Sequence, residues 1–427
     1  MLGTRTKSDM TQQLIAPAPV VARVQRVAHF TDTYLPRRDG VVTSLRTLCD
    51  ALSADGCATV TVAPRHRSQE VDPGLLALGS LPCGVADLRL GGWPTRAHIE
   101  RIAAWRPDLI HVHTPGPMGL LGTMAARRLG VPLVHSYHTD LYAYADAYRI
   151  PARAIELGLS FYAHRVGVPV PSRSGLCSRR HAALEGLNHI LLGGAAAVVV
   201  PTPAVLARGG LPIPDERIFL VPAGVAPRVV QDADIAAFRH RHGIADRGPI
   251  ALFVGRVNRE KGIDLLLAAF AQTLRRLPDA RLVLIGAVYE PRWLQRLLRS
   301  CGVADRVTVT GQLPPDEVAA AYALAQVFAF PSRTDTQGLV LQEAALAGVP
   351  SLLADPQLHG TGVLGDAARL ADAAPHAYGD ALADLLADLA GARELGVAAR
   401  ERALRHTPSQ YAAAMRDVYE IAAAALR

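Results

Sequence analysis

The amino-acid sequence predicts an α/β protein made of two doubly wound, Rossmann-like domains that face a cleft. Its 427 residues exceed what one hydrophobic core usually supports, so two domains of roughly 200 residues each are expected. Half of the residues are hydrophobic, which is ample for two cores. Short β-rich runs alternate with longer helical patterns along almost the whole chain, as they do in parallel sheets built from βαβ units.

The first half of the chain supplies five of the expected strands, with helical patterns between them. These strands cover residues 23–31, 58–63, 109–113, 132–136 and 197–201. Between the first two strands, apolar residues recur at three- and four-residue steps from Val42 to Leu52. Gly56 follows at the position where such a helix would end.

The second half repeats this plan. Its expected strands cover residues 250–255, 281–286, 306–311, 327–331 and 350–354. The stretch 220–234 interrupts the alternation with proline and glycine, which places a hinge at Ala223–Pro227. The expected division is a loose tail and two domains, then a final helix: residues 1–22, 23–222, 223–408 and 409–427.

Composition and charge narrow the classes of function. The net charge of +7 comes from basic residues spread along the chain, so a nucleic-acid partner is not expected. The first residues lack an apolar core of signal-peptide length, and the longest apolar run, ILLGGAAAVVV, is too short to span a bilayer. We therefore expect a cytoplasmic protein, at most peripheral on the inner face of the membrane. The five cysteines lack metal-ligand spacing and are typical of reduced thiols: Cys49, Cys57, Cys83, Cys177 and Cys301.

Two acidic residues mark the stretch that follows strand 327–331. Asp335 is expected in a loop, and Glu343, eight positions later, inside a helix over residues 339–346. Carboxylates form strong hydrogen bonds with vicinal hydroxyls, and the free amides at a helix start attract a phosphate or a sugar hydroxyl. An ordinary capped helix with an exposed Glu343 is the alternative interpretation.

Two cations follow strand 250–255. Arg256 and Lys261 lie in the turn before a helix, where a guanidinium fork and an ammonium group suit a diphosphate. Two solvated loop charges are the alternative. The sequence contains neither a P-loop nor a GxGxxG fingerprint, so no other nucleotide motif competes with this turn.

The first half offers a glycine and several histidines at strand ends. Gly40 heads a helix and permits close approach of a ligand to the backbone. His138 and Asp140 follow strand 132–136, where a neutral histidine can exchange hydrogen bonds with a sugar hydroxyl. No metal site is expected, because no carboxylate or cysteine completes a recognisable ligand set with three nearby histidines: His111, His113 and His135.

These four places together resemble the retaining glycosyltransferases of family 4, whose two Rossmann-like domains form the GT-B architecture. The resemblance rests on the family's E-x7-E segment, here Asp335 and Glu343 in TDTQGLVLQEA, and on its phosphate-binding turn, here GRVNREKG. It implies that Arg256 and Lys261 hold the diphosphate of the donor. It also implies that Glu343 binds the ribose of the nucleotide.

The resemblance extends to the donor sugar and to the first domain. It implies that Asp335 and the amides of Gly338 and Leu339 contact the sugar. Gly40 would approach the phosphates, and His138 would bond to a sugar hydroxyl. The last helix would cross back onto the first domain. The sequence departs from the family pattern at Asp335, which stands for the usual glutamate, at the hinge PAGVA and at GAVYE after the second strand of the second domain.

The function implied is retaining transfer of a hexosyl or N-acetylhexosaminyl group from a nucleoside-diphosphate sugar, with UDP expected, to a small polyhydroxylated alcohol of the aminocyclitol type. Neither a cofactor nor a metal is expected. The catalytic set would be Arg256, Lys261, His138 and Asp335. The cation-rich segment 148–181 supports an alternative, a membrane-associated transferase acting on diacylglycerol or phosphatidylinositol. A non-catalytic nucleotide-sugar-binding protein, an epimerase and a phosphorylase are further alternatives.

Overall fold

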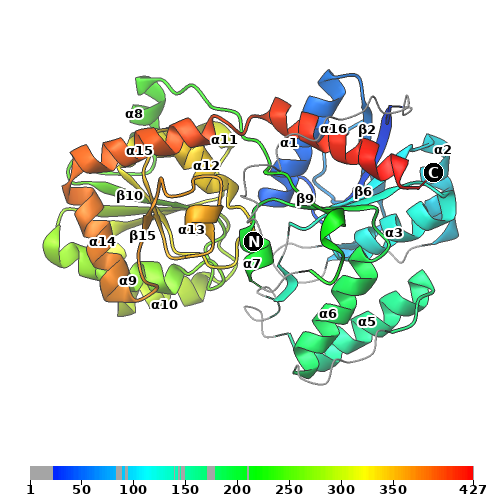
Figure 1. Cartoon of the computed structure of the whole chain (residues 1–427). Helices are drawn as coiled ribbons and strands as arrows, with labels where there is room; N and C mark the ends of the chain where they lie inside the picture. Colours follow the sequence, from blue (N-terminus) through cyan, green and yellow to red (C-terminus); the bar gives the residue numbers. More distant parts are fainter. Residues whose placement is uncertain are drawn as a thin grey trace, which may run out of the picture.

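The computed structural model forms two α/β domains that lie next to each other (Figure 1). It describes residues 23–82, 89–91, 95–138, 140–142, 145, 150–170, 178–208 and 211–426. The expected tail over residues 1–22 lies outside this described part. Among the described residues, no helix combines the length and the apolar character needed to cross a bilayer.

The first domain contains a seven-stranded sheet in which all neighbouring strands run parallel. In spatial order the strands are β3 (Leu75–Leu78), β2 (Ala58–Pro64), β1 (Arg26–Phe30), β6 (Leu109–Val112), β7 (Leu133–Ser136), β8 (Ala197–Val200) and β9 (Ile218–Leu220). The five expected strands are confirmed and occupy the middle of the sheet. Both edge strands, β3 and β9, were not predicted, because they are short and only partly buried.

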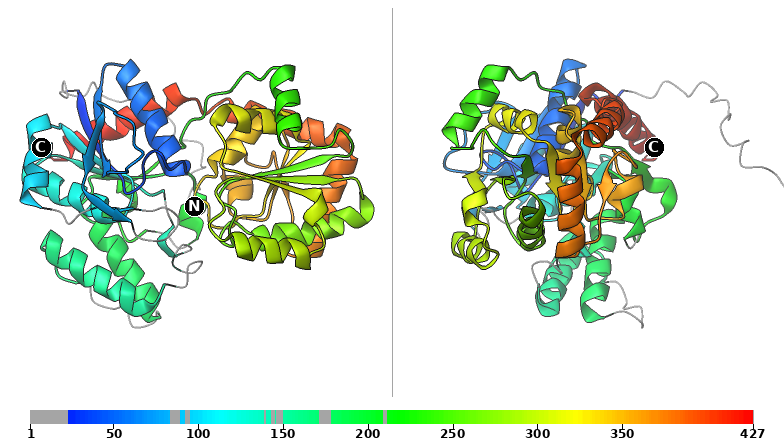
Figure 2. Two further views of the ribbon diagram at one scale, coloured as in Figure 1. Left: turned by 180° about the vertical axis from the view of Figure 1, so that it is seen from behind. Right: turned by 90° about the vertical axis from the view of Figure 1, so that its left-hand side faces the viewer.

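Helices cover both faces of this sheet. They are α1 (Gly40–Ala54), α2 (Arg96–Trp105), α3 (Pro117–Leu129), α5 (Ala152–Val166), α6 (Arg179–Leu192) and α7 (Ala204–Ala207), with a 3-10 turn over Asp215–Arg217 and a small hairpin of β4 (Ser80–Pro82) and β5 (Arg89–Gly91). Helix α1 begins where the Asp39 side chain accepts from the backbone N–H of Val42 and ends before Gly56, whose φ of +79° suits glycine. Helices α5 and α6 pack together and project from the domain (Figure 2).

The second domain repeats the arrangement with a six-stranded parallel sheet. Its spatial order is β12 (Val307–Gly311), β11 (Arg281–Ile285), β10 (Ile250–Val254), β13 (Val327–Phe330), β14 (Ser351–Leu353) and β15 (Arg369–Leu370). All five expected strands are present. Its helices are α8 (Asp232–Arg241), α9 (Ile263–Arg276), α10 (Pro291–Ser300), α11 (Pro315–Leu324), α12 (Leu339–Leu346), α13 (Leu358–Thr361), α14 (Pro375–Ala387) and α15 (Leu389–Ala403), with a 3-10 turn over Ala304–Arg306.

Both sheets have the doubly wound order. The first three strands of each domain run from the middle of the sheet to one edge, and the following strands then continue from the other side of the first strand. Ligands of such sheets bind beyond the carboxyl ends of the strands at this switch point. In the first domain the switch lies between β1 and β6, and in the second between β10 and β13. These ends position the site described below.

The last helix, α16 (Pro408–Ala424), follows the second domain and packs against α1, β7 and β8 of the first (Figures 1 and 2). It begins at Pro408, one residue before the expected start, because Thr407 caps it. Its inward face joins the core of the first domain, and the hydroxyl of Tyr411 hydrogen-bonds with the hydroxyl of Ser44 (3.1 Å). The two domains are therefore connected twice, by the hinge segment and by α16.

Candidate active site

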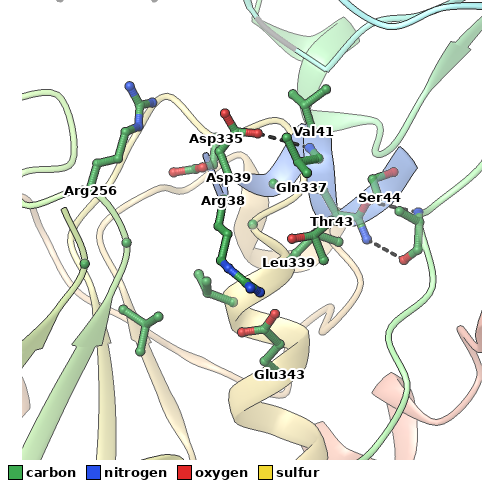
Figure 3. A pocket seen from close by; sticks show the side chains of 18 of the residues that line it. Arg38, Asp39, Val41, Thr43, Ser44, Arg256, Asp335, Gln337, Leu339 and Glu343 are labelled. Atoms are coloured by element: carbon green, nitrogen blue, oxygen red, sulfur yellow. Dashed lines mark hydrogen bonds between the residues drawn. The ribbon is translucent and has the colours of Figure 1, made fainter. Parts of the chain in front are cut away.

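A cavity of about 1240 Å³ lies between the domains and is lined by residues from both. A cavity of this size exceeds the range that is typical of sites for drug-sized ligands. The site residues proposed from the sequence all line it: Gly40, His138, Arg256, Lys261, Asp335, Gly338, Leu339 and Glu343. Figure 3 shows most of the wall formed by α12 and by the start of α1.

Helix α12 carries one of the two carboxylates. It covers the expected residues, since Gly338 at its start has a φ of +71° and Gly348 beyond its end has a φ of +77°. The Glu343 carboxylate faces the cavity, and its Oε2 accepts a hydrogen bond from the Tyr322 hydroxyl (3.1 Å). Burial raises the pKa of Glu343, against the opposing effects of this hydrogen bond and of the Arg228 charge.

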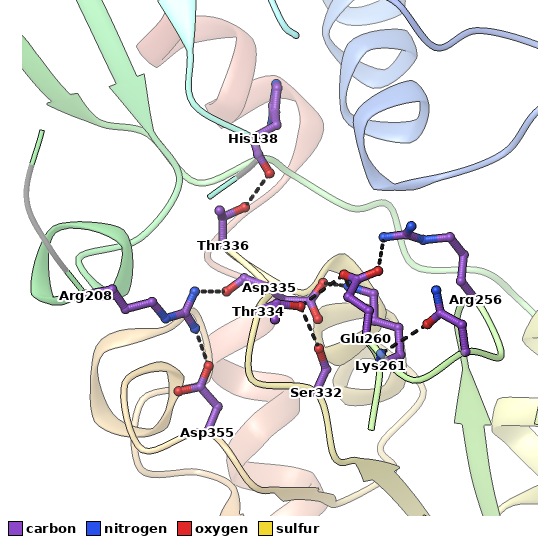
Figure 4. A network of polar contacts seen from close by, with 11 residues as sticks. His138, Arg208, Arg256, Glu260, Lys261, Ser332, Thr334, Asp335, Thr336 and Asp355 are labelled. Atoms are coloured by element: carbon purple, nitrogen blue, oxygen red, sulfur yellow. Dashed lines mark hydrogen bonds and ion pairs between the residues drawn. The ribbon is translucent and has the colours of Figure 1, made fainter. Parts of the chain in front are cut away.

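The other carboxylate, Asp335, belongs to a cluster of ions at the ends of β10 and β13 (Figure 4). Lys261 Nζ lies 2.8 Å from Asp335 Oδ1 and 3.2 Å from Glu260 Oε1. Arg256 Nη2 lies 2.7 Å from Glu260 Oε2. We call these four residues the ion cluster. The sequence reasoning missed Glu260, although its place between the two cations in GRVNREKG was the available signal.

Charges within the ion cluster control its protonation. Burial alone would raise the pKa of Asp335, but the charge and hydrogen bond of Lys261, together with Ser332 and the Arg256 charge, outweigh burial and hold this pKa below its ordinary value. Burial likewise opposes ionisation of Glu260, and the charges of Lys261 and Arg256 lower its pKa overall. Both acids are therefore ionised at neutral pH. The Glu260 side chain is only 7% exposed, so it fixes the positions of both cations.

The loop around Asp335 also contacts the first domain. Arg208 Nη1 donates to the backbone oxygen of Asp335 (2.8 Å), and the same guanidinium pairs with Asp355. The Thr336 hydroxyl donates to the backbone oxygen of His138 (3.0 Å), and the backbone oxygen of Thr336 accepts from the Thr202 hydroxyl (2.5 Å). The sequence did not predict these contacts of Arg208, Thr336 and Thr202, because the two partners of each contact are more than a hundred residues apart in the chain.

The next residue, Gln337, joins α12 to the hinge. Its side-chain Oε1 accepts from the backbone N–H of Ala223 (3.0 Å), and its Nε2 donates to the backbone oxygen of Ala223 (2.9 Å). The amide therefore satisfies both polar groups of one hinge residue in a buried position. The loop that lines the cavity and the segment that joins the domains are held together by this contact.

The first domain contributes the start of α1. Gly40 is the first residue of the helix, and a Cβ at this position would meet no other atom within 4 Å. The space that a side chain would occupy is therefore open, and Gly40 itself lines the cavity. Arg38, which was not predicted, precedes it, and Figure 3 shows its guanidinium directed toward α12 and Glu343.

His138 lies in the cavity wall after β7. Its Nε2 is 3.1 Å from Nδ1 of His113, so one ring nitrogen points into the first domain. Burial lowers the pKa of His138 to about 4, although the nearby Asp39 carboxylate opposes this shift. The imidazole is therefore neutral at pH 7. Asp140 also lines the cavity, and its Oδ1 accepts from the backbone N–H of Tyr142 (3.0 Å).

The histidines considered as metal ligands are only partly grouped together. His111 and His113 lie with His29, rather than with His135, and their ligand atoms are within 4.8 Å of one another. The ring nitrogens of His111 hydrogen-bond with the hydroxyls of Tyr419 and Ser136, each at 2.8 Å. His29 and His113 hydrogen-bond to each other.

Comparison with known proteins identifies relatives of both domains. The family described as Glycosyltransferase Family 4 matches residues 38–229, and the family described as Glycosyl transferases group 1 matches residues 234–402. D-inositol 3-phosphate glycosyltransferase of Xylanimonas cellulosilytica is 33% identical over 346 residues, which are 76% of this chain and 74% of that protein. Alpha-monoglucosyldiacylglycerol synthase of Streptococcus pneumoniae is 29% identical over 336 residues, 76% of this chain and 70% of that protein.

Solved structures match nearly the whole chain. Sucrose-phosphate synthase from Thermosynechococcus elongatus has a TM-score of 0.68 at 23% identity and covers 92% of this chain and 98% of its own. Anabaena HepE in complex with UDP and glucose has a TM-score of 0.66 at 16% identity and covers 92% of this chain and 98% of its own. At these identities the likeness establishes the two-domain fold alone.

Proposed function

The chain belongs to the family 4, group 1 glycosyltransferases with the GT-B fold, and on this premise we propose that it transfers a hexosyl or N-acetylhexosaminyl group from a nucleoside-diphosphate sugar to an acceptor hydroxyl, with retention of configuration. One observation carries the proposal. Two cations held by buried acids lie at a strand end in the same cavity as a hydroxyl-binding carboxylate on α12.

The ion cluster suits a departing diphosphate. Negative charge grows on the leaving group as the sugar–phosphate bond breaks, and fixed cations lower that barrier without having to reorganise. Arg256 and Lys261 meet this need because Glu260 and Asp335 already hold them in place. In the proposed complex the diphosphate hydrogen-bonds with both cations. The amide of Leu339, at the start of α12, adds the positive end of a helix dipole.

The two carboxylates suit the hydroxyls on either side of that diphosphate. Oε2 of Glu343 is occupied by Tyr322, which leaves Oε1 for the hydroxyls of the ribose. Oδ1 of Asp335 is occupied by Lys261, whereas Oδ2 is buried and has no hydrogen-bond partner among the described residues. A buried carboxylate oxygen without a donor is costly. The Asp335 side chain remains 21% exposed and lines the cavity, so Asp335 is proposed to orient the sugar, with a small movement of the carboxylate giving Oδ2 a hydroxyl donor.

The proposed reaction is a displacement on one face of the sugar ring. The bond between the anomeric carbon and the diphosphate oxygen breaks as the acceptor oxygen bonds to the same carbon from the same side. The proton of the acceptor hydroxyl moves to the departing phosphate oxygen. No side chain is covalently modified, and no divalent metal is proposed, because the guanidinium of Arg256 and the ammonium of Lys261 are proposed to face the leaving group in its place.

A small polyhydroxylated acceptor, such as an aminocyclitol, is proposed first. The likeness to an enzyme named for D-inositol 3-phosphate supports a cyclitol. A lipid acceptor is the second candidate, since α5 exposes Leu157 (74%) together with Arg153, and another relative is named for a glycosyldiacylglycerol product. Activity that requires anionic liposomes would favour the lipid, and full turnover of a cyclitol in buffer would favour the first candidate.

The experiment that tests the proposed function is a donor screen. UDP- and GDP-sugars are incubated with the protein and a pool of cyclitol acceptors, and products are detected by mass spectrometry. A product heavier by one hexosyl or N-acetylhexosaminyl unit, together with released nucleoside diphosphate, is expected. Tight nucleotide binding without any transfer would favour a non-catalytic binding protein, and free sugar phosphate would favour a phosphorylase.

A further inference from the structure

Three histidines, one in β1 and one just beyond the end of each of β6 and β7, form a row that leads from the core of the first domain to the cavity. Nδ1 of His29 lies 3.0 Å from Nε2 of His113, and Nδ1 of His113 lies 3.1 Å from Nε2 of His138. These are hydrogen-bond distances between ring nitrogens. His29 and His113 are at most 1% exposed, whereas His138 lines the cavity.

Each histidine of the row is neutral and has one N–H group. Burial lowers the pKa of His29 to about 3 and that of His138 to about 4, and it lowers the pKa of His113 well below its ordinary value. A neutral imidazole has one N–H donor and one bare nitrogen. With one N–H on each ring, both hydrogen bonds must have the same polarity. Either each ring donates to the next one outward, from His29 toward His138, or each donates to the next one inward, from His138 toward His29.

The inner end of the row decides between these directions. His29 Nε2 is buried and has no hydrogen-bond partner among the described residues. If the bonds ran inward, this nitrogen would be a buried N–H without an acceptor. If they run outward, it is a bare nitrogen without a donor. Orphaned buried N–H groups are the rarer of the two in proteins. The outward direction is therefore favoured.

We infer that His113, backed by His29, is a positioning residue that fixes the tautomer of His138, so that Nδ1 of His138 presents a hydrogen-bond donor to the cavity. In this arrangement His29 Nδ1–H donates to His113 Nε2, and His113 Nδ1–H donates to His138 Nε2. The proton of His138 is then on Nδ1, its other ring nitrogen.

This tautomer limits what His138 can do. Resting on the proposed function, the inference assigns Nδ1–H of His138 as a donor to a hydroxyl oxygen of the sugar. The same nitrogen cannot accept a proton while it is protonated, so His138 does not act as the base that activates the acceptor. This agrees with transfer of the acceptor proton to the departing phosphate.

Two substitutions of His113 separate its two hydrogen bonds. The amide nitrogen of asparagine lies near the place of Nδ1 and that of glutamine near the place of Nε2. His113→Asn therefore keeps a donor for His138, whereas in His113→Gln the amide oxygen can take the place of Nε2 and accept from His29, and no donor remains for His138. Both variants replace the same buried imidazole with a side-chain amide, so they form a matched pair.

The test is 15N spectroscopy of the full chain labelled at histidine, with the His138 signals assigned from a His138→Gln difference spectrum. The expected result is protonated Nδ1 and bare Nε2 in the natural protein and in His113→Asn, and a change toward protonated Nε2 in His113→Gln. With the donor sugar and acceptor found in the screen, kcat/KM of His113→Gln is expected to lie roughly five- to tenfold below that of His113→Asn, as for one lost hydrogen bond.

The spectrum of the natural protein decides the inference even if a variant does not fold. Protonated Nε2 on His138 would overturn it, as would a tautomer that is the same in both variants. Zinc or another metal bound in stoichiometric amount would also overturn it, because the facing nitrogens of His29 and His113 would then be metal ligands. The expected spectra without any detectable glycosyl transfer would leave the positioning role intact and reject the proposed function.

Discussion

Replacing Glu343 by glutamine is expected to weaken nucleotide binding without weakening the fold. The side chain lies on α12 and faces the cavity, and Tyr322 occupies only one of its oxygens. Glutamine has nearly the same shape and can still accept from Tyr322 through its own oxygen. The change therefore removes mainly the charge and the acceptor that the ribose is proposed to use.

The magnitude follows from the type of hydrogen bond that is lost. Hydrogen bonds to a charged group contribute about 1.5–3 kcal/mol each. Loss of one such bond raises Kd roughly 10- to 150-fold. The fold does not depend on this charge, because burial raises the pKa of Glu343, which means that ionisation costs free energy in the folded state.

Isothermal titration with UDP and GDP, together with thermal unfolding of the unliganded protein, measures both quantities. Glu394→Gln is a matched control, since Glu394 is exposed on α15 and lies outside the cavity. An unchanged Kd in Glu343→Gln would refute the assignment of the ribose. A large drop in the melting temperature would instead show that the carboxylate has a structural role.

Three further predictions concern the ion cluster and the pH. Arg256→Ala and Lys261→Ala should each lower kcat at least ~100-fold, as measured by steady-state kinetics. Arg259→Ala is the control and should leave kcat unchanged, because Arg259 stacks on Trp293 and lies outside the cavity. Nucleotide affinity should fall as the pH is lowered, because protonation removes the charge of Glu343. Since the pKa of Glu343 is raised, this fall should begin at a higher pH than it would for an exposed glutamate. Titrations of Glu343→Gln over the same pH range should not show the fall. Transfer should continue in excess EDTA, and activity lost in EDTA and restored by one divalent ion would reject the metal-free mechanism.

The fold was predictable because its signals are local. Each central strand is a short run of β-branched and apolar residues between turn residues, and such a run needs no distant partner to be recognised. Helix α12 was predicted to the residue, since glycines bracket it at positions that need a positive φ. The edge strands β3 and β9 lacked this signal, because a short, half-exposed strand resembles a loop in sequence.

The candidate site was predictable only in part. The strand-end rule located Arg256, Lys261 and Asp335 in one cleft. The pairing of Lys261 with Asp335 joins residues 74 positions apart, and no local pattern encodes it. The row of histidines is a similar case, since His29 and His113 are 84 positions apart and meet because β1 and β6 are neighbours in the sheet. Such contacts follow from strand order, which the sequence does not display.

The central claim is tested most directly by a crystal structure of the protein with the nucleoside diphosphate that binds tightest in the titrations. The account predicts a diphosphate within hydrogen-bond distance of Arg256 and Lys261, a ribose whose hydroxyls contact Glu343, and a terminal phosphate near the start of α12. A nucleotide bound elsewhere, or bound here with both cations still turned only toward Glu260 and Asp335, would contradict it.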